Sequence, residues 1–353
     1  MTIWLRLMRK TEWLKLLEID MKKSIKLLTP QDVPKYLVEK GVIKYSKDVL
    51  KIKELTNGNS MFVTLVKLKY SNKNKKIIIR QALNYARVKT QFKITSERLN
   101  WEADALKKYR KLVQKNILPE IISHDLVNRI LIMKDSLGTG KYFNDEYFGG
   151  IYHEDLLGKF AVFFASLHGQ SYGKSEKIWM SRAMHTFWTR TVFIEHYLVG
   201  FLELFDLKEA KKILRNSENS THCYCWMDPL IKNIIVEKNK FRIFDFEQAT
   251  IWDPAYDIGA FIAPWYFQYL KGNIKYKYIK NYFDRYSMVM GRYKVKKVDI
   301  EGILERAMVY VHTTMLHVSI GNDQWVSSSK NDKDLIIKHS KKYFSQQELK
   351  NNS

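Results

Sequence analysis

The alternation of apolar and polar positions predicts a strand-rich first third of the chain. Apolar side chains recur at every second position between residues 61 and 70, and three consecutive isoleucines occur within residues 76–83. A period of two indicates a strand with one buried face, and a short apolar run bounded by charge is typical of a buried strand. Turn-forming residues at 56–60 and 71–74 separate these runs, so we expect antiparallel strands joined by tight turns. The expected strands of this part are 52–55, 61–70, 76–83, 117–122 and 129–133.

Helical spacing dominates the rest of the chain. Residues 29–44, 96–112 and 155–168 carry apolar side chains at intervals of three and four, which predicts amphipathic helices. Two short strands, 234–236 and 242–246, interrupt this mainly helical half.

This order predicts an α+β, two-lobed fold of the protein-kinase type, with a small antiparallel sheet and one main helix followed by a larger helical lobe. Many other α+β folds share the order. The expected divisions are a basic leader (1–28), an N-lobe (29–134), a C-lobe (135–326) and a loosely packed polar tail (327–353). The leader is also readable as a misassigned start, because Met21 opens a more ordinary beginning.

Composition narrows the class of partner. Sixty Lys and Arg against 37 Asp and Glu give a net charge of +23, which favours anionic partners such as nucleotides, phosphorylated metabolites, nucleic acid or an acidic surface. No nucleic-acid-binding motif accompanies this charge. The only cysteines, Cys223 and Cys225, cannot frame a secreted disulfide fold, so we expect a reducing, cytoplasmic location. No apolar run reaches about 18 residues, so no membrane span is expected.

The spacing of four polar residues in the second half of the chain suggests a chemical function. Asn233 follows Asp228 by five residues, Asp245 follows twelve residues later, and Asp257 another twelve. The two expected strands between Asn233 and Asp245 would form a hairpin that brings their oxygens to one edge. Phosphoryl transfer from ATP needs a carboxylate to orient a hydroxyl and oxygen ligands for a divalent metal. The spacing therefore fits an ATP-dependent phosphotransferase.

This segment resembles the catalytic segment of the aminoglycoside phosphotransferase-like kinases, which share the protein-kinase fold. Their pattern reads HGDxxxxN, a hairpin, DxE or DxD, and a downstream DPxxD, and the chain keeps most of this pattern. The resemblance implies ATP and Mg²⁺ as cofactors, Asp228 as catalytic base, and Asn233 and Asp245 as metal ligands. It assigns a second metal to Glu247, and it implies that Asp257 buttresses the loop. The matching residues are Asp228, Asn233, Asp245, Glu247, Asp253, Pro254 and Asp257.

Within this group the chain looks most like the methylthioribose kinases. Residues 57–62 partly match their glycine loop, and residues 80–87 resemble their third strand. By this resemblance Arg80 would hold phosphates and pair with Glu102 of the following helix. The remaining implied nucleotide contacts are Gly58 and Asn59 in the loop, and Met133 and Asp135 at the edge that meets adenine.

The chain also departs from the family pattern. Arg80 stands where a lysine is expected, and Trp226-Met227 replaces the HG before the catalytic aspartate. Leu230 replaces the histidine that often follows that aspartate. His168 is expected to be a core or loop-bracing histidine, and His222 with the two cysteines is not expected to bind zinc.

Three functions remain in view. The leading one is a small-molecule kinase that phosphorylates a sugar-like or other small alcohol, with methylthioribose the first acceptor to consider. The residues 265–325, with Trp265, Tyr266 and Tyr269, are expected to form much of the acceptor pocket. The departures motivate a second reading, a catalytically impaired kinase-like nucleotide-binding protein. The net charge motivates a third, a basic protein associated with nucleic acid. The sequence leaves the oligomeric state open.

Overall fold

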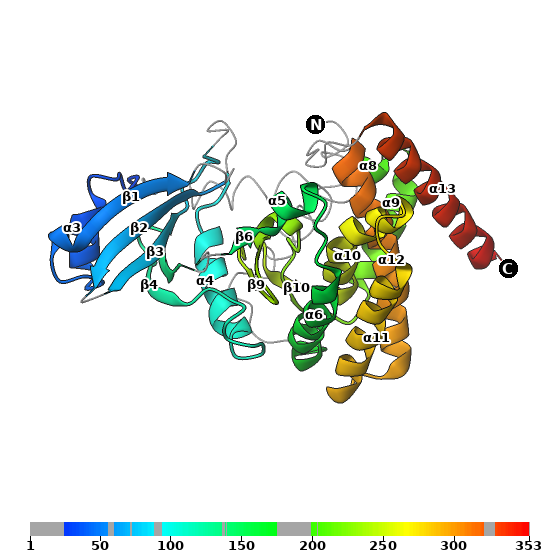
Figure 1. The fold of residues 1–353 in the computed structure, drawn as a ribbon. Helices are drawn as coiled ribbons and strands as arrows, with labels where there is room; N and C mark the ends of the chain where they lie inside the picture. The colour runs from blue at the N-terminus through cyan, green and yellow to red at the C-terminus, as the bar shows by residue number, and fades with distance from the viewer. Residues whose placement is uncertain are drawn as a thin grey trace. The chain divides into compact units, whose positions relative to one another are not determined.

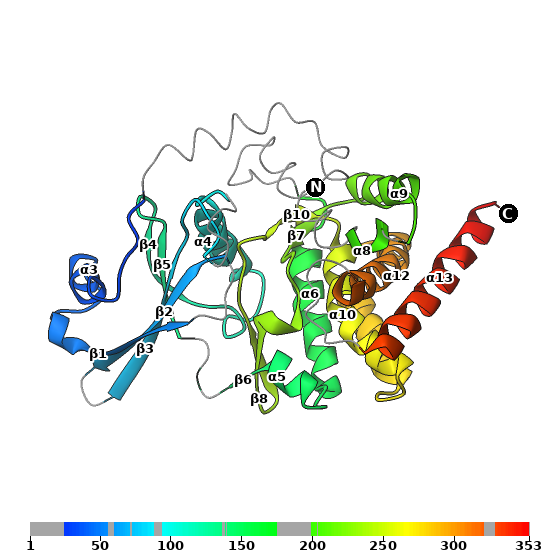
Figure 2. The same cartoon turned by 90° about the horizontal axis from the view of Figure 1, so that it is seen from above.

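The structure is a computed structural model, shown in Figures 1 and 2. It describes residues 25–55, 60–70, 73–87, 94–135, 138, 140–174, 199–202, 204–320 and 329–352. The chain divides into two compact units. The first runs to Lys108 and resumes over Asn116–Gly138, and the second comprises Tyr109–Lys115 and the chain from Thr139 onward.

The first unit is built on a five-stranded antiparallel sheet with the order β1-β2-β3-β5-β4. Its regular elements, in chain order, are α3 (Val33–Glu39), a 3₁₀ turn (Ser46–Asp48), β1 (Val49–Leu55), β2 (Phe62–Tyr70), β3 (Lys73–Gln81), α4 (Arg98–Tyr109), β4 (Ile121–Asp125) and β5 (Ile130–Lys134).

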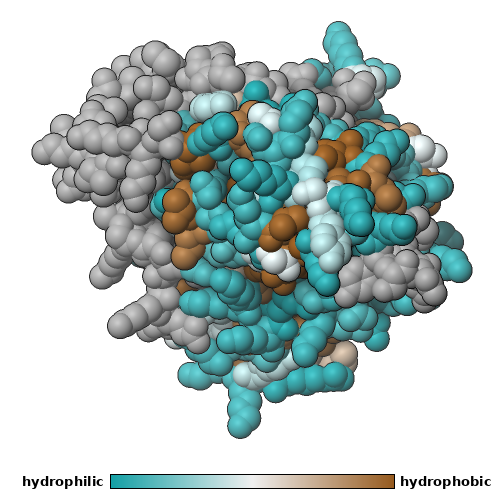
Figure 3. All heavy atoms as spheres, turned by 90° about the vertical axis from the view of Figure 1, so that its left-hand side faces the viewer, coloured by the Kyte–Doolittle hydropathy of each residue, from teal (hydrophilic) through white to brown (hydrophobic). Residues whose placement is uncertain are grey.

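Alternation along β3 directs its side chains to two faces of this sheet. Ile77 and Ile79 belong to a buried cluster with Leu37 of α3 and Val66 of β2, so α3 covers one face (Figure 1). Arg80 points to the opposite face, since successive side chains of a strand alternate. On the side of the unit shown in Figure 3, hydrophilic side chains predominate and the apolar ones form small separate patches.

The second unit is mainly helical, with a small hairpin and two short paired strands. Its elements are β6 (Lys141–Tyr142), α5 (Phe143–Phe148), a 3₁₀ turn (Glu154–Leu156), α6 (Leu157–Ser171), α8 (Val199–Leu202), α9 (Leu207–Glu218), β7 (Cys223–Cys225), η4 (Ile231–Asn233), β8 (Ile234–Glu237), β9 (Lys240–Ile243), β10 (Thr250–Trp252), α10 (Pro254–Leu270), α11 (Tyr276–Arg292), α12 (Lys297–Ile320) and α13 (Lys330–Asn352).

Helices α10 and α12 lie side by side at close range (Figures 1 and 2). A Cβ atom on Gly259 of α10 would lie 2.3 Å from the Ala307 carbonyl oxygen and 2.5 Å from Tyr310 Cβ, both on α12. Contacts this short are not possible for a larger residue, so the glycine of the Asp257–Ala260 segment allows the two helices to touch.

The expected order of a small antiparallel sheet followed by a helical part is confirmed, with corrections to several boundaries. The first helix is shorter than the expected 29–44, and Gly41 beyond its end has φ +66°. The expected strand 117–122 is wrong for its first half. Pro119 has no amide hydrogen for a sheet, and β4 begins at Ile121.

The expected loose tail from residue 327 is also wrong where the structure describes it. Residues 330–352 form α13, which packs on α12. Tyr343 stacks on His312 with ring centroids 4.3 Å apart, and Ser340 Oγ lies 3.1 Å from His312 Nδ1. A few apolar and aromatic side chains at helical spacing within the polar sequence therefore suffice to anchor this helix. The expected leader, residues 1–28, lies almost wholly outside the described residues.

Candidate active site

The hairpin of β8 and β9 places the polar residues of the central motif at one end. Ile234 pairs with Ile243, and the Phe244 amide donates to the Asn233 carbonyl oxygen at 3.1 Å. Asn233 thus stands directly before one strand and Asp245 two residues after the other. The second strand ends at Ile243, so the expectation that it extends to residue 246 is wrong. Asp245 has φ +68°, which takes the chain out of the ladder.

Asp228 is joined to Asn233 in this region. The Asn233 side chain donates from Nδ2 to Asp228 Oδ2 at 2.8 Å and to the Asp228 carbonyl oxygen at 3.1 Å. Burial raises the pKa of Asp228, and the charge of Asp245 raises it further, while Lys232 at 3.6 Å opposes the shift. The motif residues Asp228, Asn233 and Asp245 therefore come together, as the spacing predicts.

These residues suit a hard divalent cation. Carboxylate and amide oxygens are its preferred ligands, and Asn233 uses its nitrogen toward Asp228, which leaves the amide oxygen available. The mutual charge that raises the pKa of Asp228 is also the electrostatic condition that a cation relieves. Glu247 follows in the turn after Phe246 and is largely buried.

Asp257 holds the backbone of the loop that leads to Asp228. It lies in the first turn of α10, where Oδ2 accepts from the Trp226 amide at 2.6 Å and Oδ1 from the Met227 amide at 2.9 Å. His168 Nε2 of α6 contacts Oδ2 at 3.3 Å, and its Nδ1 lies 3.0 Å from the Tyr286 hydroxyl. The expectations that Asp257 buttresses the loop and that His168 braces it are confirmed.

The structure explains how Trp226 and Met227 fit where the family pattern has HG. Met227 adopts φ +65°, a conformation that a glycine adopts without strain, and its side chain is buried. Trp226 donates from Nε1 to the Asp245 carbonyl oxygen at 2.8 Å and stacks on Phe246 at 5.5 Å. The tryptophan therefore ties the Asp228 loop to the segment after β9.

Asp253 directly precedes α10 and caps its first turn. Its side chain accepts from the Ala255 amide at 3.1 Å, and Arg306 of α12 donates to both of its oxygens at 2.8 and 3.0 Å. Arg306 was not predictable from the sequence, because a partner 53 residues away leaves no local signal.

Cys223 and Cys225 form a buried group with His168, whose ligand atoms all lie within 4.8 Å of one another. Burial raises the pKa of both thiols. Cys225 Sγ donates to the Trp252 carbonyl oxygen at 3.4 Å, and both nitrogens of His168 already have partners. The group is accounted for by packing and hydrogen bonding.

The first unit contains the expected basic–acidic pair. Arg80 Nη1 on β3 lies 3.0 Å from Glu102 Oε1 on α4, and both side chains are buried. Met133 is buried in β5, and the Asp135 amide donates to the Lys76 carbonyl oxygen at 3.2 Å. Gly58 and Asn59 lie outside the described residues.

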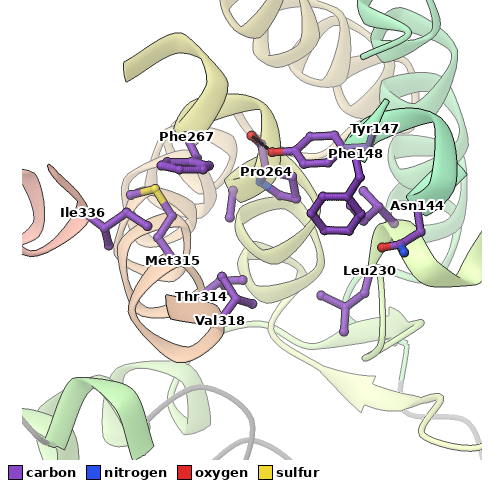
Figure 4. A pocket seen from close by; sticks show the side chains of 12 residues that line it. Asn144, Tyr147, Phe148, Leu230, Pro264, Phe267, Thr314, Met315, Val318 and Ile336 are labelled. Atoms are coloured by element: carbon purple, nitrogen blue, oxygen red, sulfur yellow. Dashed lines mark hydrogen bonds between the residues drawn. The ribbon is translucent and has the colours of Figure 1, made fainter. Parts of the chain in front are cut away.

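An apolar pocket in the second unit adjoins the Asp228 loop (Figure 4). Leu230 and Ile231 of the loop form one wall, and α5, α10, α12 and α13 contribute the others. Trp265 is not part of it, because this residue is fully buried and its Nε1 donates to the Tyr152 carbonyl oxygen at 2.8 Å. The lining residues are Asn144, Tyr147, Phe148, Leu230, Ile231, Ala263, Pro264, Phe267, Thr314, Met315, Val318 and Ile336.

Part of the chain matches a known protein family. Residues 149–287, which include the whole hairpin region, match the model of the phosphotransferase enzyme family. The match covers less than half of the chain. No curated protein sequence matches this chain. In the part of the chain that the structure describes, no helix is long and apolar enough to cross a membrane.

Several solved structures align with most of this chain. A choline kinase from Cryptosporidium parvum aligns with a TM-score of 0.52 and 13% identity, over 92% of this chain and 97% of that one. A choline/ethanolamine kinase family protein from Mesorhizobium loti aligns with a TM-score of 0.46 and 14% identity, over 88% and 93%. An aminoglycoside phosphotransferase from Alicyclobacillus acidocaldarius gives 0.47 and 12%, over 92% and 95%. The first likeness shows that this chain has the expected kinase-like fold.

Proposed function

We propose that the protein is an ATP-dependent phosphotransferase that moves the γ-phosphate to a hydroxyl group of a small molecule. The observation that carries this proposal is the convergence of Asp228, Asn233 and Asp245 at one end of the β8–β9 hairpin, inside the segment that matches the phosphotransferase family. The choline kinase whose fold this chain shares supports the same class of activity.

The residues have distinct proposed roles. Asp228 orients the acceptor hydroxyl and accepts its proton as the oxygen attacks phosphorus, while the bond between the γ-phosphorus and the bridging oxygen of ADP breaks. Asn233, Asp245 and Glu247 hold Mg²⁺, which when bound neutralises charge on the phosphates. Asp257 and His168 keep the loop in place without touching the reacting atoms.

The nucleotide side of the proposal rests on the first unit. Arg80, oriented by Glu102, binds phosphates of ATP with a planar fork of donors. Gly58 and Asn59 contribute to the phosphate loop, and Met133 and Asp135 lie on the segment that meets adenine. Methylthioribose is the first acceptor to test, because residues 57–62 and 80–87 resemble its kinases.

The test is ADP release with ATP, Mg²⁺ and a panel of small alcohols that includes methylthioribose. We expect Asp228→Asn and Asp245→Asn to lower turnover by about 10²–10⁴-fold or more, because each removes a group needed in the transition state. Asp284→Asn, at an exposed position on α11, is the matched control and should keep full turnover.

Near-normal turnover in Asp245→Asn would contradict the metal-site assignment. Nucleotide binding without turnover of any acceptor would favour the impaired kinase-like protein instead. Binding of duplex DNA or RNA with a steep salt dependence would favour the nucleic-acid reading.

A further inference from the structure

We infer that the groove between α6 and α11 is a docking site for an acidic amphipathic helix of a partner protein. The two helices lie side by side in the second unit (Figure 1). Val162 and Ser166 of α6 and five residues of the segment 285–293 line the groove. None of these residues belongs to the proposed catalytic or metal-binding set, so the inference does not depend on the proposed function.

The groove is large enough to receive side chains of another molecule. Its volume is about 360 Å³, against about 30 Å³ for the pocket in Figure 4. Volumes of roughly 300–1,000 Å³ are typical of sites that bind a ligand.

The centre of the groove exposes apolar side chains. Val162 is 39% exposed, Met288 48% and Tyr293 38%. Single exposed apolar residues are common on protein surfaces, but three that line one groove form a patch that binding would bury. Methionine, tyrosine and arginine are also enriched in protein–protein interfaces. The composition of the groove is therefore that of an interface.

Two arginines flank this apolar centre. Arg285 and Arg292 are seven residues apart on α11, which places them on one face and about 10 Å apart along the helix axis. Among the described residues Arg285 has no hydrogen bond or ion pair, and Arg292 approaches only Met288 Sδ, at 3.8 Å. By contrast, Arg242 and Arg306 each bind a carboxylate, at 3.2 and 2.8 Å.

Neither helix supplies a carboxylate to neutralise the groove. Helix α6 contains no Asp or Glu, and the one acidic residue of α11, Asp284, is paired with Lys280 at 2.6 Å. The groove therefore carries two positive charges beside apolar surface, and its complement is an anionic molecule with an apolar body. The planar fork of arginine suits a carboxylate, which it binds through two parallel hydrogen bonds.

Two glycines of α6 allow the groove side chains to lie directly on its backbone. A Cβ atom on Gly158 would lie 3.0 Å from Arg285 Nη1, and one on Gly169 would lie 2.6 Å from Tyr293 Cδ2. Packing at these two points restricts the arginine and the tyrosine before a partner binds. Such restriction reduces the side-chain entropy that is lost on binding.

The spacing of the arginines selects a helical partner. A helix that lies along α11 advances by the same 1.5 Å or so per residue, so glutamates at positions i and i+7 match Arg285 and Arg292. Leucines at i+3 and i+4 of that helix then lie between the two ion pairs, over the apolar centre. This is the pattern of an amphipathic helix that binds in a groove.

The experiment uses a fluorescein-labelled, alanine-based helical peptide with this Glu and Leu pattern, and its anisotropy is measured with the full chain. We expect the double variant Arg285→Gln/Arg292→Gln to raise the Kd of the peptide by about 5- to 20-fold, as for loss of two partly exposed ion pairs. Met288→Gln should raise the Kd by about 3-fold, because it makes the centre of the groove polar.

A second double variant controls for net charge. Lys35→Gln/Arg215→Gln removes two positive charges from exposed positions outside the groove, on α3 and α9, and should change the Kd by less than about 2-fold. The groove variants should keep the urea midpoint of the wild type, since Arg285 and Arg292 bind no oxygen acceptor among the described residues. ADP release should also be unchanged in them.

A peptide of the same composition, with its glutamates at i and i+5, tests the geometry. The second glutamate then points away from α11, so this isomer should bind more weakly than the original peptide. Equal affinity for the isomer, or an unchanged Kd in the arginine double variant, would overturn the inference. Tighter binding of single-stranded RNA or of anionic lipid vesicles than of the peptide, lost in the same variant, would overturn it too.

Failure of the proposed function has a different signature. Peptide binding is measured without ATP or acceptor, so a protein that releases no ADP with any acceptor can still bind the peptide with the predicted dependence on Arg285 and Arg292.

Discussion

The two units each bury charged side chains at a candidate site, and they hold them in different ways. In the first unit Arg80 and Glu102 lie on a regular strand and a regular helix, and the pair closes directly at 3.0 Å. In the second, Asp228 lies on an irregular loop whose shape depends on Asp257 and His168 from other elements.

The second arrangement places strained backbone next to the proposed chemistry. Met227 and Asp245 both have positive φ, at +65° and +68°. Each such residue costs on the order of 1–2 kcal/mol. The hydrogen bonds from the loop amides to Asp257 and from Trp226 to the Asp245 carbonyl offset that cost. The Arg80–Glu102 pair therefore depends on one strand and one helix, whereas the shape of the Asp228 loop depends on hydrogen bonds from several residues that are distant in the sequence.

The largest effect is expected from replacing Asp257, which holds the backbone of the loop that leads to Asp228. Asp257→Asn keeps the shape of the side chain but turns an amide nitrogen toward one of the two loop amides and removes the charge beside His168. Breaking a buried ionic group costs about 3–5 kcal/mol, and turnover should fall with it. Urea unfolding and ADP release measure both quantities. A loss below that of the exposed Asp284→Asn control would show that the loop does not depend on Asp257.

The second prediction concerns the pH dependence of stability. Burial opposes protonation of His168, but hydrogen bonding to Asp257 and Cys225 outweighs it and raises the pKa of His168 to about 9. The folded pKa lies above the unfolded value, so this contribution is complete below pH 6.5 and is lost as pH rises toward 9. A shift of this size amounts to about 3 kcal/mol.

Urea unfolding at pH 6 and pH 9 tests this sign. The wild type should lose stability across that window, and His168→Gln should show a flatter profile. Cys223 and Cys225, whose pKa burial raises, also lower stability toward pH 9, but they do so in both proteins, so the difference between the two profiles reports on His168. Equal slopes in both proteins would mean that folding does not raise the pKa of His168.

The smallest effect is expected at the Arg80–Glu102 pair. Arg80→Met and Glu102→Gln should each destabilise the fold, and the double variant should lose less than their sum. The coupling energy should be about 0.5–3 kcal/mol. In the Glu102→Gln background, Arg80→Met should also weaken ATP binding, whereas Lys53→Met at an exposed position of β1 should not. Unchanged ATP affinity would contradict the phosphate role.

Much of the fold was predictable because its signals are local. The alternation over residues 61–70 corresponds to β2 (Phe62–Tyr70), and the helical spacing over 155–168 to α6 (Leu157–Ser171). The errors lie where local pattern and tertiary packing disagree. Polar residues hid α13, whose position depends on contacts such as that of Tyr343 with His312.

The polar residues of the site were predictable for a similar reason. Asp228, Asn233 and Asp245 are separated by one short hairpin, and its geometry brings its two ends together wherever it lies in a fold. Arg306 beside Asp253 was not predictable, because that contact spans 53 residues and depends on how α10 meets α12.

The sequence by itself therefore determined the strands and helices and the set of oxygen donors, because both follow from spacing over a few residues. The tertiary structure alone decided the apolar pocket beside the Asp228 loop. The pocket combines residues from Asn144 to Ile336, and apolar side chains that line a cavity have the same periodicity as those that fill a core. Only their packing distinguishes the two.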